Sequence, residues 1–241
     1  MNIKMYSNIL FIVLLLQSTV IAIYDIAAQS ISQETDSTLA NLRGSLVQLN
    51  WAEHEVEEIT KIMHGTSYIR QQATEQRFKQ EAGKAKIIHL ATHANTDDEN
   101  PMYSNFVFVP DTSAGEDGFL NTYELYNMQL NADLVVLSGC NTGYGKLYRG
   151  EGVMSLARGF MYAGCPRIVM SLWSVDDQSS AKIMNIFYKN LADGLTINDA
   201  LRQAKLTYLR TTDKIKSNPF YWAGFVSIGE TAPLILNSGL N

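Results

Sequence analysis

Residues 134–143 read LVVLSGCNTG, an apolar run that passes directly into small and polar residues. A continuous apolar run of this kind is typical of a strand whose sheet is covered by helices on both faces. Residues 87–94, IIHLATHA, repeat the pattern. We predict that the two runs are parallel neighbouring strands, and that the side chains just beyond their carboxyl ends, Cys140 and His93, emerge at one rim of the sheet.

The rest of the chain alternates between the strand and helix patterns. In the helix expected over residues 51–63, Val56, Ile59 and Met63 fall on one face and acidic residues cover the other. The other expected helices cover residues 74–78, 122–126, 152–162, 179–191 and 197–209, and the expected strands cover residues 86–91, 105–109, 133–138, 167–172 and 221–228. This alternation predicts an α/β fold, a three-layer α/β/α sandwich with a mainly parallel central sheet.

Composition limits the classes of protein to consider. With 241 residues, 46% of them hydrophobic, the chain is long enough for one sizeable α/β domain. The net charge of −5 gives no electrostatic reason to expect directly bound nucleic acid. Cys140 follows an expected strand whereas Cys165 precedes one, which separates the two by about 20 Å for six residues of strand. A disulfide between them is therefore not expected.

The amino terminus allows two interpretations. In the first, the apolar run of residues 9–16 after Lys4, with a cleavage site at Val20-Ile21-Ala22, is a signal or anchor segment. In the second, residues 20–24 form a core strand that ends at Asp25, and cleavage after Ala22 would cut this strand. The polar residues 17–19 interrupt the run before the roughly 18 residues that a membrane-spanning helix needs. A cytoplasmic location is slightly favoured, with export or membrane anchoring if residues 1–22 are a signal segment.

The rim of the sheet carries the residues for covalent acyl transfer. An imidazole at His93 can take the proton of the Cys140 thiol, and the resulting thiolate is the nucleophile. Backbone N–H groups of Cys140 and Ala94 are the candidate donors for the oxyanion. The alternative is that Cys140 is an inert buried thiol, as free cysteines commonly are.

Three further residues follow the strand expected at 167–172. Trp173 is a candidate wall of a substrate pocket, and the carboxylate of Asp176 or Asp177 could attract a basic substrate side chain. The alternative is that Asp176 caps the following helix and that Trp173 belongs to the core.

Metal and cofactor chemistry is not indicated. His89 stands four residues before His93, about 13 Å along a strand, so the two do not suit one metal ion, and His89 is expected to be a buried structural imidazole. Zinc-ligand spacing, a Gly-x-Ser-x-Gly elbow and a phosphate-binding loop are all missing from the sequence. The prediction is therefore no cofactor and no metal.

Several motifs together carry a family resemblance. They are HLATH at residues 89–93, ADLVVLSGCNTG at 132–143, GEGV at 150–153, AGC at 163–165, SLWSVDD at 171–177 and YWAGF at 221–225. In order and spacing over residues 50–230 they resemble the CHAT domain family of caspase-like cysteine peptidases, relatives of separases and caspases.

The resemblance implies a caspase-like sandwich in which His93 is the general base and Cys140 the nucleophile. It also divides the chain into an apolar amino-terminal segment at residues 1–19 (signal-like, or the remnant of an upstream domain), a peptidase domain at 20–230 and a tail at 231–241. Members often follow tetratricopeptide repeats and act as regulated proteases, in some cases in bacterial defence. Ala94 departs from the Gly that commonly follows this His, and the amino-terminal part is short, which raises the alternative of a truncated domain.

The predicted function is a caspase-like cysteine endopeptidase in a regulated bacterial signalling or defence context. Its expected partners are a protein or peptide substrate and a tetratricopeptide-repeat region or regulator supplied elsewhere. One alternative is a catalytically silent interaction module or truncated fragment. Another is an amidotransferase or hydrolase of the Cys–His type, in which the His usually follows the Cys; here His93 precedes Cys140 by 47 residues (140 − 93), and no His follows Cys140.

Overall fold

The computed structural model describes most of the chain between its amino-terminal strands and residue 235. The described residues are 10–13, 20–24, 51–97, 99–111, 113, 115–138, 147–148, 152–153, 156–173 and 176–235.

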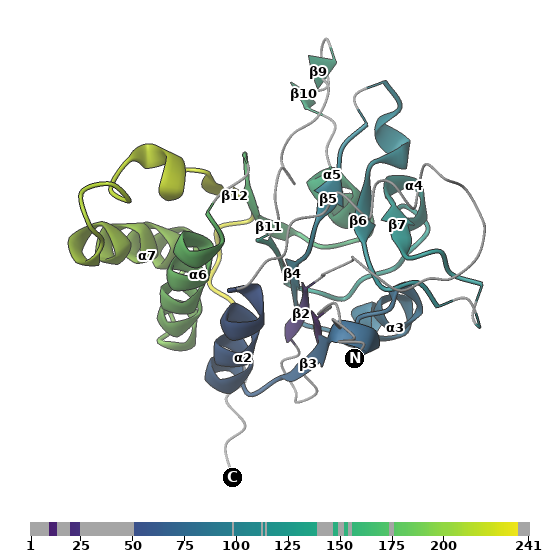
Figure 1. Ribbon diagram of the computed structural model, residues 1–241, viewed down its shortest axis with the longest axis horizontal. Coiled ribbons are helices and arrows are strands. Elements are labelled where there is room, and N and C mark those ends of the chain that lie inside the picture. The colour runs from purple at the N-terminus through teal and green to yellow at the C-terminus, as the bar shows by residue number, and fades with distance from the viewer. Residues whose placement is uncertain are drawn as a thin grey trace, which may run out of the picture.

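A seven-stranded sheet forms the centre of the fold (Figure 1). Its strands, in spatial order, are β1 (Leu10–Val13), β3 (Thr66–Ile69), β2 (Val20–Tyr24), β4 (Ile87–Ala91), β8 (Leu134–Leu137), β11 (Arg167–Ser171) and β12 (Phe225–Gly229). From β3 to β11 all neighbours are parallel, whereas β1 and β12 pair antiparallel at the two edges. The predicted, mainly parallel central sheet is confirmed.

Helices cover both faces of this sheet. On one face lie α2 (Ala52–Met63), α6 (Asp177–Ala192) and α7 (Ile197–Thr211), and on the other lie α3 (Glu75–Glu81), α4 (Thr122–Leu125) and α5 (Leu156–Tyr162) (Figure 1). Successive strand residues divide between two cores, because side chains alternate across a strand. Val136 packs with α2, α6 and α7, and its neighbour Val135 packs with the other helices. The three-layer α/β/α sandwich is thus confirmed.

A smaller sheet follows β4 directly. It consists of β5 (Ala94–Asn95), β6 (Asn105–Val107) and β7 (Phe119–Asn121), paired antiparallel in that order. The remaining strands, β9 (Leu147–Tyr148) and β10 (Gly152–Val153), form a separate antiparallel pair. Short 3₁₀ turns cover Arg70–Gln72, Ala82–Lys84, Pro101–Tyr103 and Pro219–Tyr221. The chain therefore passes from β4 through His93 directly into the smaller sheet.

Local polar residues cap the first turns of α3 and α4. The Thr74 side chain accepts a hydrogen bond from the N–H of Arg77, so Thr74 is the N-cap of α3. Asn121 is the N-cap of α4 and forms a capping box with Glu124. Thr122, the first residue of α4, donates its hydroxyl hydrogen to the Ser104 carbonyl.

Two elements begin four residues later than predicted (156 − 152 and 225 − 221). The helix expected from residue 152 begins at Leu156, because Gly152 and Val153 pair as strand β10 with Leu147–Tyr148. Glycine is a poor helix former, which agrees with this late start. The strand expected from residue 221 begins at Phe225, because the 3₁₀ turn at Pro219–Tyr221 occupies the preceding segment.

The amino-terminal strands belong to the central sheet. β2 lies between β3 and β4, which confirms the strand interpretation of residues 20–24. β1, which lies within residues 1–19, pairs with both β2 and β3. The domain boundary at residue 20 stays a prediction. Among the described residues, no helix combines the length and the apolar composition needed to cross a membrane.

Gly229, at the end of β12, is expected to tolerate no side chain. Its φ is 103°, and a Cβ atom there would overlap the carbonyl oxygen of Pro166. We expect Gly229→Ala to lower the free energy of unfolding by about 2–4 kcal/mol, from left-handed strain plus the overlap. Urea denaturation measures this, with Gly194→Ala as control: its φ is 85° but no atom lies within 4 Å of the added carbon. Equal losses in both variants would contradict the role of the overlap.

Candidate active site

The two strands that precede His93 and Cys140 are parallel neighbours. β4 and β8 pair in register, with Leu90 opposite Leu137. His93 and Cys140 each follow this pair by three residues (93 − 90 and 140 − 137). Cys140 lies outside the described residues. The expected adjacency of the strands is confirmed, and the distance between the imidazole and the thiol stays a prediction.

His93 is held in a short turn between β4 and β5. Its side chain is buried, with 8% of its surface exposed. Its carbonyl accepts a hydrogen bond from the N–H of Val107 at 2.9 Å, and the hydroxyl of the preceding Thr92 donates to the carbonyl of Val107 at 2.6 Å. These two bonds attach the turn to β6, so the backbone that carries the imidazole is fixed from the side of the smaller sheet.

Ala94 directs its N–H away from that sheet. Ala94 lies opposite Phe106, and the bond from Val107 N–H to the His93 carbonyl belongs to the neighbouring pair of the antiparallel ladder. Hydrogen-bonded and non-hydrogen-bonded pairs alternate in such a ladder, so the pair Ala94–Phe106 is of the second kind. Its N–H therefore points outward from β6, as an oxyanion donor at this position would require.

His89 is the buried imidazole that the sequence predicts, with none of its side-chain surface exposed. The structure adds an unexpected partner, Glu55 of α2, whose Oε1 lies 2.8 Å from His89 Nε2. The sequence pattern predicts that the acidic residues of this helix lie on its solvent side, and for Glu55, which is buried, this prediction is wrong. Glu55 stands between Ala52 and Ile59 in the buried stripe of α2, at spacings of three and four. An acid at that spacing is the signal that could have identified it.

The side chains of Asp176 and Trp173 both form hydrogen bonds within the protein. The Asp176 carboxylate accepts from the N–H and the hydroxyl of Ser179 and pairs with Lys216 at 3.1 Å, so Asp176 is the N-cap of α6. Burial opposes its ionisation, but these hydrogen bonds and the ammonium group together lower its pKa. The Trp173 ring is partly buried against the core of α2, α6 and α7, and its Nε1–H donates to the Phe220 carbonyl.

Asp177, in the first turn of α6, accepts the backbone N–H of Trp51 at 2.6 Å. Burial raises the pKa of its carboxyl to about 6; the Trp51 N–H opposes the increase, and the charge of Glu55 adds to it. Because α6 follows β11, Asp177 stands near the same rim as His93, with β8 between the two strands.

Cys165 has the properties of an inert thiol. It is 1% exposed, and its Sγ lies 3.2 Å from the carbonyl oxygen of Arg167. Burial raises its pKa to about 12. At neutral pH Cys165 therefore stays protonated and should not react with alkylating agents, since the thiolate is the reactive form.

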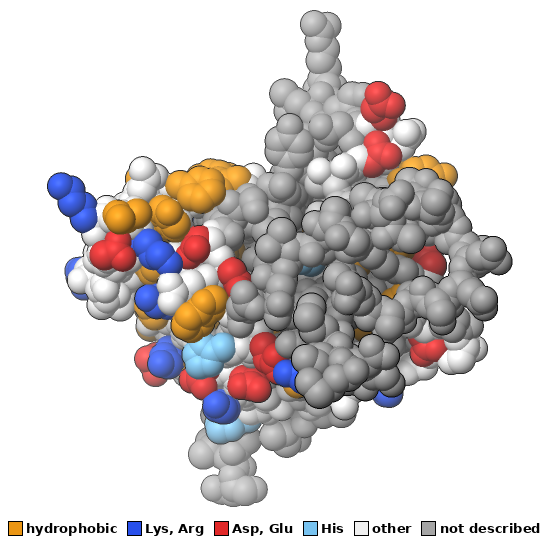
Figure 2. All heavy atoms as spheres, viewed as in Figure 1, with side chains coloured by type: hydrophobic (Ala, Val, Ile, Leu, Met, Phe, Trp, Pro, Cys, Tyr) orange, Lys and Arg blue, Asp and Glu red, His pale blue; other side chains and the backbone are white. Residues whose placement is uncertain are grey.

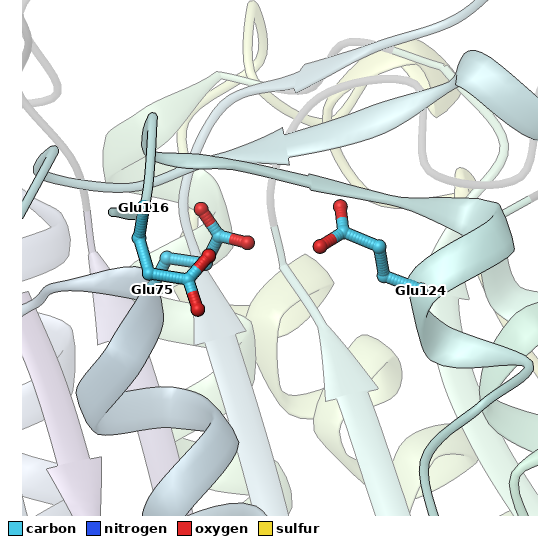
Figure 3. A group of neighbouring side chains, drawn as sticks. All are labelled: Glu75, Glu116 and Glu124. Carbon is cyan, nitrogen blue, oxygen red and sulfur yellow. The ribbon is translucent and has the colours of Figure 1, made fainter. Parts of the chain in front are cut away.

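Three carboxylates converge on the α3 side of the sheet. Figure 3 shows Glu75 of α3, Glu116 of the loop before β7 and Glu124 of α4 turned toward one another. Lys79 Nζ lies 2.7 Å from Glu75, 2.8 Å from Glu116 and 2.8 Å from Glu124, so this ammonium already occupies the position that a cation would take. The cluster is an ion network that joins α3, the loop and α4.

The cluster predicts a pH-dependent contribution from Glu75. Burial raises its pKa to about 7; Lys79 opposes the increase, and the charges of Glu124 and Glu116 add to it. A folded-state pKa above the unfolded value means that this carboxyl stabilises the fold below about pH 4.5 and loses that contribution as the pH rises through 7. The difference in unfolding free energy between Glu75→Gln and wild type should therefore shift in favour of the variant from pH 5 to pH 8, by about 2 kcal/mol.

Urea unfolding at both pH values measures this difference. Glu58→Gln is the control, because Glu58 forms an exposed pair with Lys61 on α2. Stability curves of wild type and Glu75→Gln that run parallel between pH 5 and pH 8 would contradict the proposed titration.

Acidic and basic side chains stand side by side on the face drawn in Figure 2, over the region of α2 and α6. The mixture agrees with the small net charge of −5. On this part of the described surface there is no field of one sign that would select a strongly charged partner.

Comparison with known proteins gives matches over most of the chain. The CHAT domain family matches residues 17–230. Tetratricopeptide repeat protein 28 of Homo sapiens is 28% identical over 220 residues, 78% of this chain and 9% of that protein. Its counterpart from Mus musculus is 25% identical with the same coverage. The chain therefore spans about a tenth of the length of these relatives. Since the family match covers well over half of the chain and agrees with the α/β sandwich, the chain belongs to the CHAT domain family.

Proposed function

We propose that this protein is a cysteine endopeptidase in which His93 removes the proton of Cys140 and the thiolate attacks a peptide carbonyl. The observation that carries the proposal is the in-register parallel pairing of β4 and β8. Because of this pairing, the two chain segments that carry His93 and Cys140 begin at neighbouring strand ends. Positioned base and nucleophile are the minimum for acyl transfer, and the rim of such a sheet is where sites are commonly built.

Two further observations support this chemistry. His93 is fixed by hydrogen bonds to β6, which reduces the entropy lost when base and nucleophile meet the substrate. The outward N–H of Ala94, with the N–H of Cys140, would stabilise the oxyanion. Family membership agrees with a caspase-like peptidase, in a regulated signalling or defence setting.

A partner supplied elsewhere is part of the proposal. The human and mouse relatives are named for tetratricopeptide repeats, and this chain matches 9% of their length. We propose that a repeat region or other regulator acts on this domain. A catalytically silent interaction module is the competing function. The similarity to these two relatives is equally compatible with that function.

A thiol-reactive peptide probe separates peptidase from silent module. We expect one adduct, on Cys140 by intact and peptide mass, which is lost in Cys140→Ala and strongly reduced in His93→Ala. Cys165→Ala is the control and should label like wild type, because its thiol is buried. Labelling that survives both the Cys140 and the His93 substitutions would favour the silent module.

Substrate preference tests the proposed pocket of Trp173, Asp176 and Asp177. If Asp177 contacts the residue before the scissile bond, cleavage should prefer Arg or Lys there, and Asp177→Asn should reduce the preference about ten- to hundredfold. The preference should weaken as the pH falls below about 6, where the Asp177 carboxyl becomes protonated. A substrate-library profile measures both effects. A profile dominated by Leu or Asp at that position would reject this pocket.

A further inference from the structure

One buried imidazole connects the candidate catalytic rim to two helices of the sandwich. His89 of β4 lies within hydrogen-bond distance of one group from α2, one from α6 and one from the residue that follows β8. Its Nε2 is 3.1 Å from Ser138 Oγ and 2.8 Å from Glu55 Oε1, and its Nδ1 is 3.1 Å from Tyr188 Oη. These four residues, the His89 network, are at most 8% exposed.

The network favours one arrangement of protons. Burial, followed by the charge of Glu55, holds the pKa of Tyr188 well above 10, so its hydroxyl keeps its proton. If the Tyr188 hydroxyl donates to Nδ1, then Nε2 carries the ring proton and donates to Ser138 Oγ. Within the described part of the chain, Glu55 Oε1 has no partner of good hydrogen-bond angle, so its 2.8 Å approach to Nε2 is a close polar contact and not a well-aligned hydrogen bond.

Ser138 transmits this arrangement to the rim. It directly follows β8, and its N–H donates to the Leu90 carbonyl of β4 at 2.9 Å. Its hydroxyl also lies 3.4 Å from that carbonyl, in addition to its contact with His89. In sequence, Ser138 stands two residues before Cys140, and His89 stands four residues before His93. The His89 ring therefore connects β4, which leads to His93, with Ser138, which leads to Cys140.

We propose that Ser138, His89 and Glu55 are positioning residues that set where the segment carrying Cys140 leaves β8 relative to the His93 turn. The inference rests on the proposed peptidase function. A shift of about 1 Å at a reacting pair can lower a rate by about a hundredfold, so such a support has a measurable effect on the dyad. A merely structural serine in the same place would change stability without changing the ionisation of Cys140.

The test is the pH profile of Cys140 carboxymethylation by iodoacetamide, quantified by mass on the full chain. The variants are Ser138→Ala, Ser138→Thr and Glu55→Gln. Ser180→Ala is the matched control, because Ser180 is also buried and its hydroxyl has no hydrogen-bond partner among the described residues. Thermal unfolding of each variant shows whether the fold persists.

We expect Ser138→Ala and Glu55→Gln to slow alkylation at pH 7 at least tenfold and to move the profile toward that of His93→Ala. Ser138→Thr, which keeps the hydroxyl, should restore most of the rate, and Ser180→Ala should match wild type. If His93→Ala changes the profile while folded Ser138→Ala and Glu55→Gln both match Ser180→Ala, the positioning role is overturned and the peptidase proposal stands. If His93→Ala has no effect on the profile, the dyad and the positioning role both fail.

Discussion

Replacing His93 by Ala is expected to lower the rate of peptide-bond cleavage at pH 7 by about 10²- to 10⁴-fold, the usual contribution of a positioned general base. The reason is that the Cys140 thiol, without a neighbouring imidazole, is mostly protonated at this pH and therefore weakly nucleophilic. The measurement is the single-turnover rate of cleavage of a peptide amide substrate, followed from pH 5 to pH 10.

The pH profile distinguishes loss of the base from loss of the fold. In His93→Ala the remaining rate should increase with pH toward the ordinary thiol pKa, near 8.5, because hydroxide then deprotonates Cys140. Cys140→Ala should abolish cleavage at every pH, and Cys165→Ala should leave it unchanged because Cys165 is buried. A His93→Ala rate within threefold of wild type would exclude the proposed dyad.

Replacing His89 by Ala is expected to give the largest loss of stability, about 3–5 kcal/mol, from the cavity and the lost polar partners together. The substitution leaves the Glu55 carboxylate, which is 1% exposed, without the ring nitrogen at 2.8 Å. It also removes the partner of the Tyr188 hydroxyl and opens a cavity between β4 and α6. Equilibrium urea unfolding by circular dichroism measures this loss.

Two variants separate the electrostatic part of this loss from the packing part. Tyr188→Phe removes only a hydroxyl and should cost about 1 kcal/mol. The double variant Glu55→Leu with His89→Leu removes both polar partners and should be more stable than His89→Ala, because no buried carboxyl group is left without a polar neighbour. A double variant no more stable than His89→Ala would show that the unpaired Glu55 does not cause the loss.

The sequence predicts the central strands well, because their signal is local. The runs at residues 87–91 and 134–137 carry apolar side chains on both faces of the strand, which is favourable only where helices cover both faces of the sheet. The ends of other elements depend on non-local contacts, which the sequence pattern does not show. The pattern predicts a helix that begins at Gly152, yet Gly152 pairs with Tyr148 in a strand. Phe225 starts the last strand only because that strand aligns antiparallel with β11.

The candidate site was predictable in its residue types and only partly in its supports. His93 follows from its place at a strand end, and the helix-capping role of Asp176 from the spacing to Ser179. The contact of Glu55 with His89 joins residues 34 positions apart (89 − 55), and Tyr188 comes from another helix, 99 positions from His89. Contacts at such separations leave no periodic pattern in the chain.

By itself, the sequence determined the class of fold, the family resemblance and the two residues proposed for catalysis. Each of these depends on short motifs whose chemistry and strand-end position are local properties. Only the tertiary structure decided that β4 and β8 are in register, that the Ala94 N–H faces outward and that Glu55, Tyr188 and Ser138 surround His89. The physical reason is that strand register and buried polar partners are selected when the layers pack together, where an unpaired buried group costs more free energy than any local preference supplies.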